Sequence, residues 1–185
     1  MPQHGATEPY VPQQNSEETF DRLIEEGEQR LGRSWLGLVA TGFLGGLDVG
    51  IGVLALLLVE HTTHSVLLGG LAFSAGFIAL SIANSELFTE NFLVPVVALV
   101  ARRGTVLGLA RLWATTLLTN LLGGWVVTGL VMAGFPALRG SALEAAQSYV
   151  DLGVGWSAFA LALVGGMLIT LMTHLQHAAN SEGVR

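Results

Sequence analysis

The stretch from 66 to 101, VLLGGLAFSAGFIALSIANSELFTENFLVPVVALVA, decides the fold of this chain. Two apolar segments, 66–83 and 92–101, flank the polar octet 84–91, which holds two carboxylates and two amides. As one continuous helix, these 36 residues would be about 54 Å long, whereas the apolar core of a bilayer is about 30 Å thick. The pattern predicts one crossing made of a helix, a non-helical break at 84–91 in mid-membrane, and a half-helix. In the alternative, 66–83 spans alone, the octet lies at the membrane interface, and 92–101 rests on the surface.

Three further apolar stretches, at 35–59, 106–133 and 152–175, are each long enough to cross a bilayer. The chain is 51% hydrophobic and only 12% charged, whereas a soluble domain carries about 25% charged residues. The sequence therefore predicts an all-α membrane protein with four transmembrane helices, the second of them broken, in a domain of residues 34–176. A polar loop is expected between the third span and the fourth. The first span is too long for the core of a signal peptide, so we expect it to be retained as an anchor.

The segment before the first span divides into a tail and a helix. Residues 1–15 are rich in proline, glutamine and glycine and are expected to be a disordered cytoplasmic tail. Residues 16–33 carry an i,i+4 pair, Glu26 and Arg30, on a polar face. The opposite face holds apolar side chains at helical spacing: Phe20, Leu23, Ile24 and Leu31. This predicts a cytoplasmic amphipathic helix that packs on the membrane surface or on the protein's inner face, with a partner-binding helix as the alternative.

The arginines set the expected orientation, because cytoplasmic loops of membrane proteins carry an excess of Arg and Lys. Lysine is absent, and only Arg139 falls in the loop before the fourth span. The other arginines lie before the first span, after the second segment and at the C-terminus: Arg22, Arg30, Arg33, Arg102, Arg103, Arg111 and Arg185. We therefore expect a multi-pass protein of the cytoplasmic (inner) membrane. Both termini, including a short tail at 177–185, should be cytoplasmic.

Asp48 lies in the middle of the first span among glycines. A central aspartate costs roughly 2.5–3.5 kcal/mol on insertion scales, so it needs a partner or a wet cavity. The structural interpretation is a hydrogen bond to a neighbouring helix, with Arg111 or Asn120 of the third span as the expected partner. The alternative is a cavity-facing carboxylate that takes part in transport.

The sequence offers little support for a metal site or for enzymatic activity. Cysteine is absent, which excludes disulfides and thiol chemistry. Two histidine pairs, His61 with His64 and His174 with His177, have ligand-like spacing, but no cysteine supports either pair. The carboxylates and histidines also lack the spacing that an intramembrane hydrolase would need. We expect no metal, no cofactor, no nucleic-acid partner and no enzymatic activity.

The second segment resembles the formate/nitrite transporter family. The similarity is carried by 68–77, by 85–92, and by parts of the third span at 111–113 and 120–124. The family's Glu-Leu-Phe-Thr-Gly-Asn element stands here as ELFTEN at 86–91, with glutamate in place of glycine as in a less studied branch of the family.

The resemblance implies a homopentamer of aquaporin-like protomers, each with a pore for small monovalent anions such as formate or nitrite, with or without protons. It assigns Leu87 and Phe88 to a hydrophobic constriction and Thr89 to a pore-facing hydroxyl. Glu86, Glu90 and Asn91 complete the expected pore site.

The chain also departs from the family pattern. It ends after the fourth span, so the resemblance implies a protomer lacking its last two helices, and glycines at 165 and 166 replace Cys-Asn. The family's pore lysine has no counterpart. The expected alternatives are a six-helix protein cut short and a chain that cannot build the pore alone, the latter acting as a non-transporting assembly subunit or remnant. Glycines four residues apart, Gly42, Gly46 and Gly50, favour close packing between copies of the chain.

Overall fold

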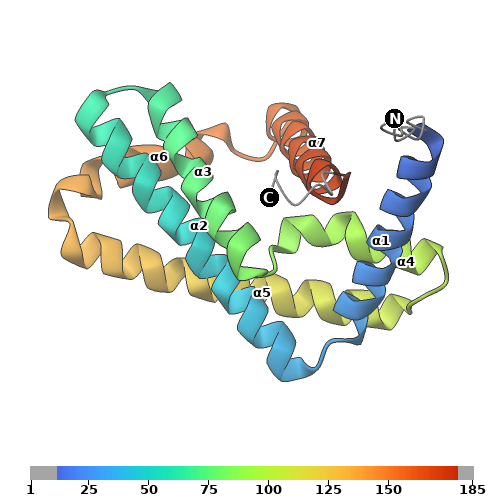
Figure 1. The fold of residues 1–185 in the computed structure, drawn as a ribbon. Helices are drawn as coiled ribbons and strands as arrows, with labels where there is room; N and C mark the ends of the chain where they lie inside the picture. Colours follow the sequence, from blue (N-terminus) through green and yellow to red (C-terminus); the bar gives the residue numbers. More distant parts are fainter. Residues whose placement is uncertain (1–11, 179–185) are drawn as a thin grey trace, which may run out of the picture.

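The computed structural model describes residues 12–178, and in that range it contains helices and no strands. Figure 1 shows the helices α1 to α7. The elements in chain order are α1 (Pro12–Gly32), α2 (Trp35–Thr63), α3 (Val66–Ala83), the 3-10 helix η1 (Phe88–Phe92), α4 (Val94–Val100), α5 (Val106–Gly134), the 3-10 helix η2 (Pro136–Leu138), α6 (Arg139–Leu152) and α7 (Trp156–Ala178). Within the described residues, four helices are long and apolar enough to cross a bilayer: α2, α3, α5 and Trp156–Gln176 of α7. The prediction of four apolar spans in an all-helical chain is confirmed.

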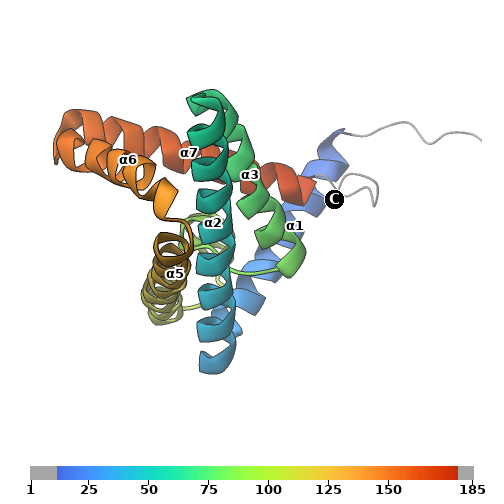
Figure 2. The same cartoon turned by 90° about the vertical axis from the view of Figure 1, so that its left-hand side faces the viewer.

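Helix α2 is the centre of the fold and packs along both α3 and α5 (Figures 1 and 2). Small residues allow these close approaches. A Cβ on Gly46 would overlap the carbonyl of Asn120 in α5, and a Cβ on Gly50 would lie 2.6 Å from the Cβ of Val127. The face of Gly42, Gly46 and Gly50, which we expected to contact another copy, is therefore covered by α5 of the same chain. These glycines do not support self-association.

Helix α1 packs on the protein itself, beside α4 (Figure 1). Gly27 makes this contact close, because a Cβ there would overlap the carbonyl oxygen of Val94. Leu31 and Leu38 bury their side chains in one apolar cluster with Ala98 and with two leucines of α5. The amphipathic helix is thus anchored next to the segment that follows the polar octet.

Three predicted boundaries are wrong. Helix α1 begins at Pro12, inside the expected tail, because proline fits the first turn, where its missing N–H would be unbonded anyway. The expected polar loop is mostly helix α6, since the run ALEAAQ at 142–147 consists of strong helix formers. The fourth long helix starts at Trp156 and not near Leu152, because Gly153 turns the chain with a φ of 60°.

Helix α7 is the least packed of the four candidate spans. It touches α1 and η1, and most of its surface is exposed. Figure 2 shows it running across the direction of α2. Most of the expected C-terminal tail, residues 179–185, and the first eleven residues of the expected N-terminal tail lie outside the described residues.

Candidate functional site

The octet connects α3 to α4 through an irregular turn. Asn84 ends α3 in the left-handed conformation, with a φ of 50°, and its N–H bonds the carbonyl of Leu80. Residues 85–87 have no regular secondary structure. The prediction of a wholly non-helical octet is wrong for 88–91, which lie in the 3-10 helix η1, a common short connector between helices. We call residues 84–92 the break.

Asn120 of α5 holds the break from one side. Its side-chain amide donates to the carbonyls of Glu86 (2.9 Å) and Gly42 (2.6 Å), and its oxygen accepts the backbone N–H of Phe88 (2.7 Å). The backbone N–H of Glu86 also donates to the carbonyl of Thr41 in α2 (3.1 Å). Polar backbone groups of the break are therefore bonded by side chains and carbonyls of the spans, as irregular backbone away from water requires.

Asp48 belongs to the same site, but the expected partners are wrong. Its carboxylate accepts a hydrogen bond from the hydroxyl of Ser85 at 2.5 Å, and Ser85 is buried. Asn120 binds the break instead, and Arg111 donates to the carbonyls of Leu31 and Arg33, both at 2.8 Å. Tertiary packing decides this choice, because α2 brings Asp48 to the end of α3 rather than to the arginine near the start of α5.

Asn91 is fully buried and ties the break to α1 and α5. Its side chain accepts from Arg30 (3.0 Å) and donates to Thr116 (3.4 Å). Its carbonyl accepts from the indole N–H of Trp113 (2.8 Å). The ring of Trp113 in turn stacks on Phe92, with centroids 4.8 Å apart.

The two carboxylates of the break lie beside arginines of the α1–α2 junction. Glu86 Oε1 is 2.6 Å from Arg33 Nη1, and Glu90 Oε2 is 3.8 Å from Arg30 Nη1. Both glutamates are at most 4% exposed. Composition did not reveal this pairing, because the partners are more than 50 residues apart in sequence.

The other side of the break carries the residues that the resemblance assigned to the pore. Leu87 and Phe88 are half-buried and Thr89 is exposed. Phe88 packs edge-on against Phe92, with centroids 5.1 Å apart. Within the described residues, the Thr89 hydroxyl has no hydrogen-bond partner and is available to a ligand.

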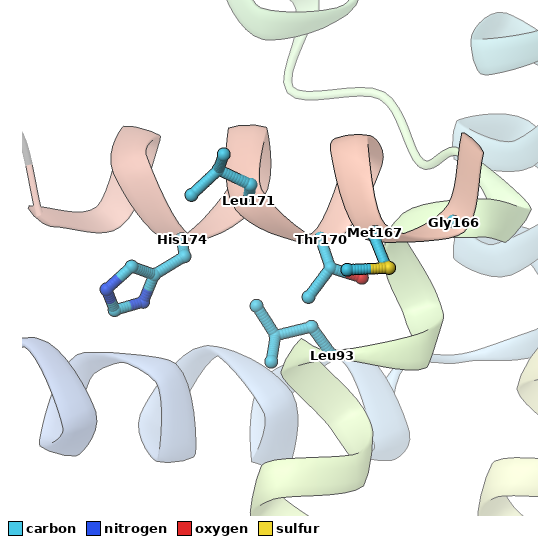
Figure 3. A pocket seen from close by; sticks show the side chains of 6 residues that line it. All are labelled: Leu93, Gly166, Met167, Thr170, Leu171 and His174. Atoms are coloured by element: carbon cyan, nitrogen blue, oxygen red, sulfur yellow. The ribbon is translucent and has the colours of Figure 1, made fainter. Parts of the chain in front are cut away.

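An open pocket of about 540 Å³ lies where the break meets α7 (Figure 3). Its walls are Leu93 on one side and residues of α7 on the other: Gly166, Met167, Thr170, Leu171 and His174. No spacing rule predicts that Thr170 and Leu93 line one pocket. No cluster of three or more His, Cys, Asp or Glu side chains suited to a metal occurs among the described residues.

Comparison of the sequence with known proteins identifies a family to which the chain is similar. The family model described as formate/nitrite transporter matches residues 17–185. The inner membrane protein YfdC of Escherichia coli is 29% identical over 176 residues, which cover 89% of this chain and 56% of YfdC. The uncharacterized transporter YrhG of Bacillus subtilis is 30% identical over 152 residues, 75% of this chain and 56% of YrhG.

A third relative carries a functional name. The formate channel BtFdhC of Bacillus thuringiensis is 28% identical over 113 residues, 58% of this chain and 44% of that protein. The chain spans about half the length of the curated relatives it matches. With its four apolar helices and a family match over nearly the whole sequence, the chain is an integral membrane protein that belongs to the formate/nitrite transporter family.

Proposed function

We propose that the chain forms a channel or transporter for small monovalent anions such as formate or nitrite in the cytoplasmic membrane. The observation that carries this proposal is the two-sided break: its carboxylates are buried beside arginines, whereas Thr89 is exposed with no hydrogen-bond partner among the described residues, and Leu87 and Phe88 are half-buried. Relatives named as a formate channel and a probable formate transporter support the choice of substrate class.

In the proposed mechanism, the anion reaches Leu87 and Phe88 and loses part of its hydration shell at this apolar constriction. The hydroxyl of Thr89 replaces one water as a hydrogen-bond donor. The apolar side chains favour the neutral acid over the anion, so protonation of formate lets it pass the constriction as formic acid. The proton comes from water on the entry side and returns to water beyond the constriction, so this route carries one proton with each formate.

The proposal extends to assembly and placement. The protomer is aquaporin-like, its second span is a helix interrupted by the break at membrane depth, and five copies associate, each with its own pore. Both termini are cytoplasmic, as the distribution of arginines indicates. Glu90 supports the proposal that the chain belongs to the family branch with glutamate at this position.

Uptake of radiolabelled formate into proteoliposomes tests the function. Thr89→Val removes the hydroxyl at nearly constant volume and should lower the initial rate several-fold while the protein stays folded. Thr62→Val is the matched control, since the Thr62 hydroxyl bonds only backbone carbonyls at the exposed end of α2. A wild-type rate equal to that of empty liposomes would contradict transport and favour the non-transporting assembly subunit.

A further inference from the structure

We propose that Arg30 and Arg33 set the charge selectivity of the break by neutralising Glu90 and Glu86, so that α1 is part of the selectivity machinery. This inference rests on the proposed function, because it gives residues outside the break a role in selecting the anion. It makes the two arginines positioning and specificity-determining residues that need not touch the anion.

Glu86 shows why compensation is needed. Its side chain is 2% exposed, and among the described residues neither carboxylate oxygen accepts a hydrogen bond, so the group is held by charge alone. Arg33 supplies that charge at 2.6 Å and also donates to the Thr41 hydroxyl (3.2 Å), which fixes the guanidinium against α2. A buried carboxylate whose cation is removed becomes an uncompensated charge.

The carboxylate of Glu90 lies near Arg30, which precedes Arg33 by about one helical turn. The Arg30 side chain is 9% exposed and lies between three groups, with Nη1 at 3.0 Å from Asn91 Oδ1, Nη2 at 2.6 Å from Glu26, and Nη1 at 3.8 Å from Glu90. A guanidinium with several donors suits this arrangement better than an ammonium would. The Glu26–Arg30 pair expected from sequence is therefore present, and its arginine also reaches the break.

The arginines are held in place by α5. Arg111 donates to the carbonyls of Leu31 at the end of α1 and Arg33 in the link to α2, and its guanidinium lies 5.3 Å from the centre of the Trp35 ring. The close contact of Gly27 with α4 fixes the other side of α1. The cations therefore have fixed positions relative to the break.

The consequence for permeation follows from the sequence of the break. Glu86 and Glu90 flank Leu87, Phe88 and Thr89 in the chain, so carboxylates that lost their arginines would add negative charge close behind the constriction. Acidic groups around a pore favour cations, whereas anion pores use basic ones. With both carboxylates paired, the constriction carries no net negative charge and admits an anion.

The test is dual-label uptake of formate and rubidium ion by the full chain in proteoliposomes. Arg33→Gln should lower the ratio of formate to rubidium uptake more than tenfold, because one uncompensated negative charge repels formate and attracts rubidium, each by at least about tenfold when the charge lies within about 12 Å of the path at an effective dielectric constant of about 20. Arg33→Gln/Glu86→Gln should restore the ratio to near the wild-type value, since the second change removes the stranded charge. Arg30→Gln should lower the ratio by a smaller factor, because Glu90 lies 3.8 Å from Arg30 and has further interactions, and Arg30→Gln/Glu90→Gln should raise the ratio again.

Arg103→Gln is the control, because Arg103 pairs with Glu28 at 4.0 Å on an exposed surface. It should leave the ratio unchanged. If the single variants lower both fluxes equally and the double variants do not recover, the arginines are merely structural and the inference is overturned. An unchanged ratio in Arg33→Gln and Arg30→Gln overturns it as well. If the wild type takes up no formate, the proposed function fails first and this inference falls with it.

Discussion

Replacing Asn120 with leucine removes the polar groups that bridge α2, α5 and the break, and keeps a branched side chain with the same number of heavy atoms. The carbonyl of Glu86 and the N–H of Phe88 then lose their side-chain partner, whereas Gly42 lies inside α2 and keeps its helical hydrogen bond. Each stranded buried group costs about 1–3 kcal/mol, so the free energy of unfolding should fall by about 2–6 kcal/mol.

The measurement is reversible unfolding in mixed micelles of a mild detergent and dodecyl sulfate, followed by circular dichroism. Gln176→Leu is the control, because Gln176 donates to Ser81 on an exposed surface (3.0 Å) and surface changes of this kind cost within about 0.5 kcal/mol. If Asn120→Leu and Gln176→Leu lower the free energy of unfolding by the same amount, the hydrogen bonds of Asn120 do not hold the break in place, and the reasoning is refuted.

Three further outcomes are expected. Gly46→Val should destabilise the chain by about 1–3 kcal/mol, because its side chain would overpack against α5. Gly124→Val should not, because the nearest atom to its Cβ would be 3.9 Å away. Thermal unfolding of both variants is the measurement. Single cysteines at Thr62 and Glu144, both exposed, should react with an impermeant thiol reagent added outside intact cells, and labelling only after permeabilisation would reverse the proposed orientation. Native mass measurement should find the chain associated with copies of itself, five in the proposed assembly, and a monomer at all concentrations would count against it.

Hydropathy predicted most of the fold because the bilayer requires long apolar helices, and length alone showed that 66–101 could not be one straight span. Local propensity is a weaker guide where polar residues punctuate a segment. Arg139, Glu144 and Asp151 indicated a loop, yet the alanines between them form helix α6. The charges of such a segment are a poorer guide than the helix propensity of the residues between them.

The candidate site was predictable as a stretch but not as a set of contacts. A polar octet between apolar segments marked where irregular backbone must be satisfied. The partners that satisfy it come from α1, α2 and α5, and no spacing rule connects residues so far apart. Asp48 shows the limit: its cost in a span predicted a partner, but only the packing of α2 on α3 selects Ser85.

The division of the break into two sides bears on how it would work. Glu86, Glu90 and Asn91 are the residues with the greatest need for partners, and all three are buried beside α1 or α5. Leu87, Phe88 and Thr89 carry no charge, and they are the more accessible residues of the break, with Thr89 exposed and the other two half-buried. A site built in this way binds an anion weakly, since one hydroxyl and two apolar groups replace little of its hydration. Weak binding suits conduction, in which the ligand must also leave. The arginines are therefore better placed behind the carboxylates than in the path, where a bare guanidinium would hold the anion.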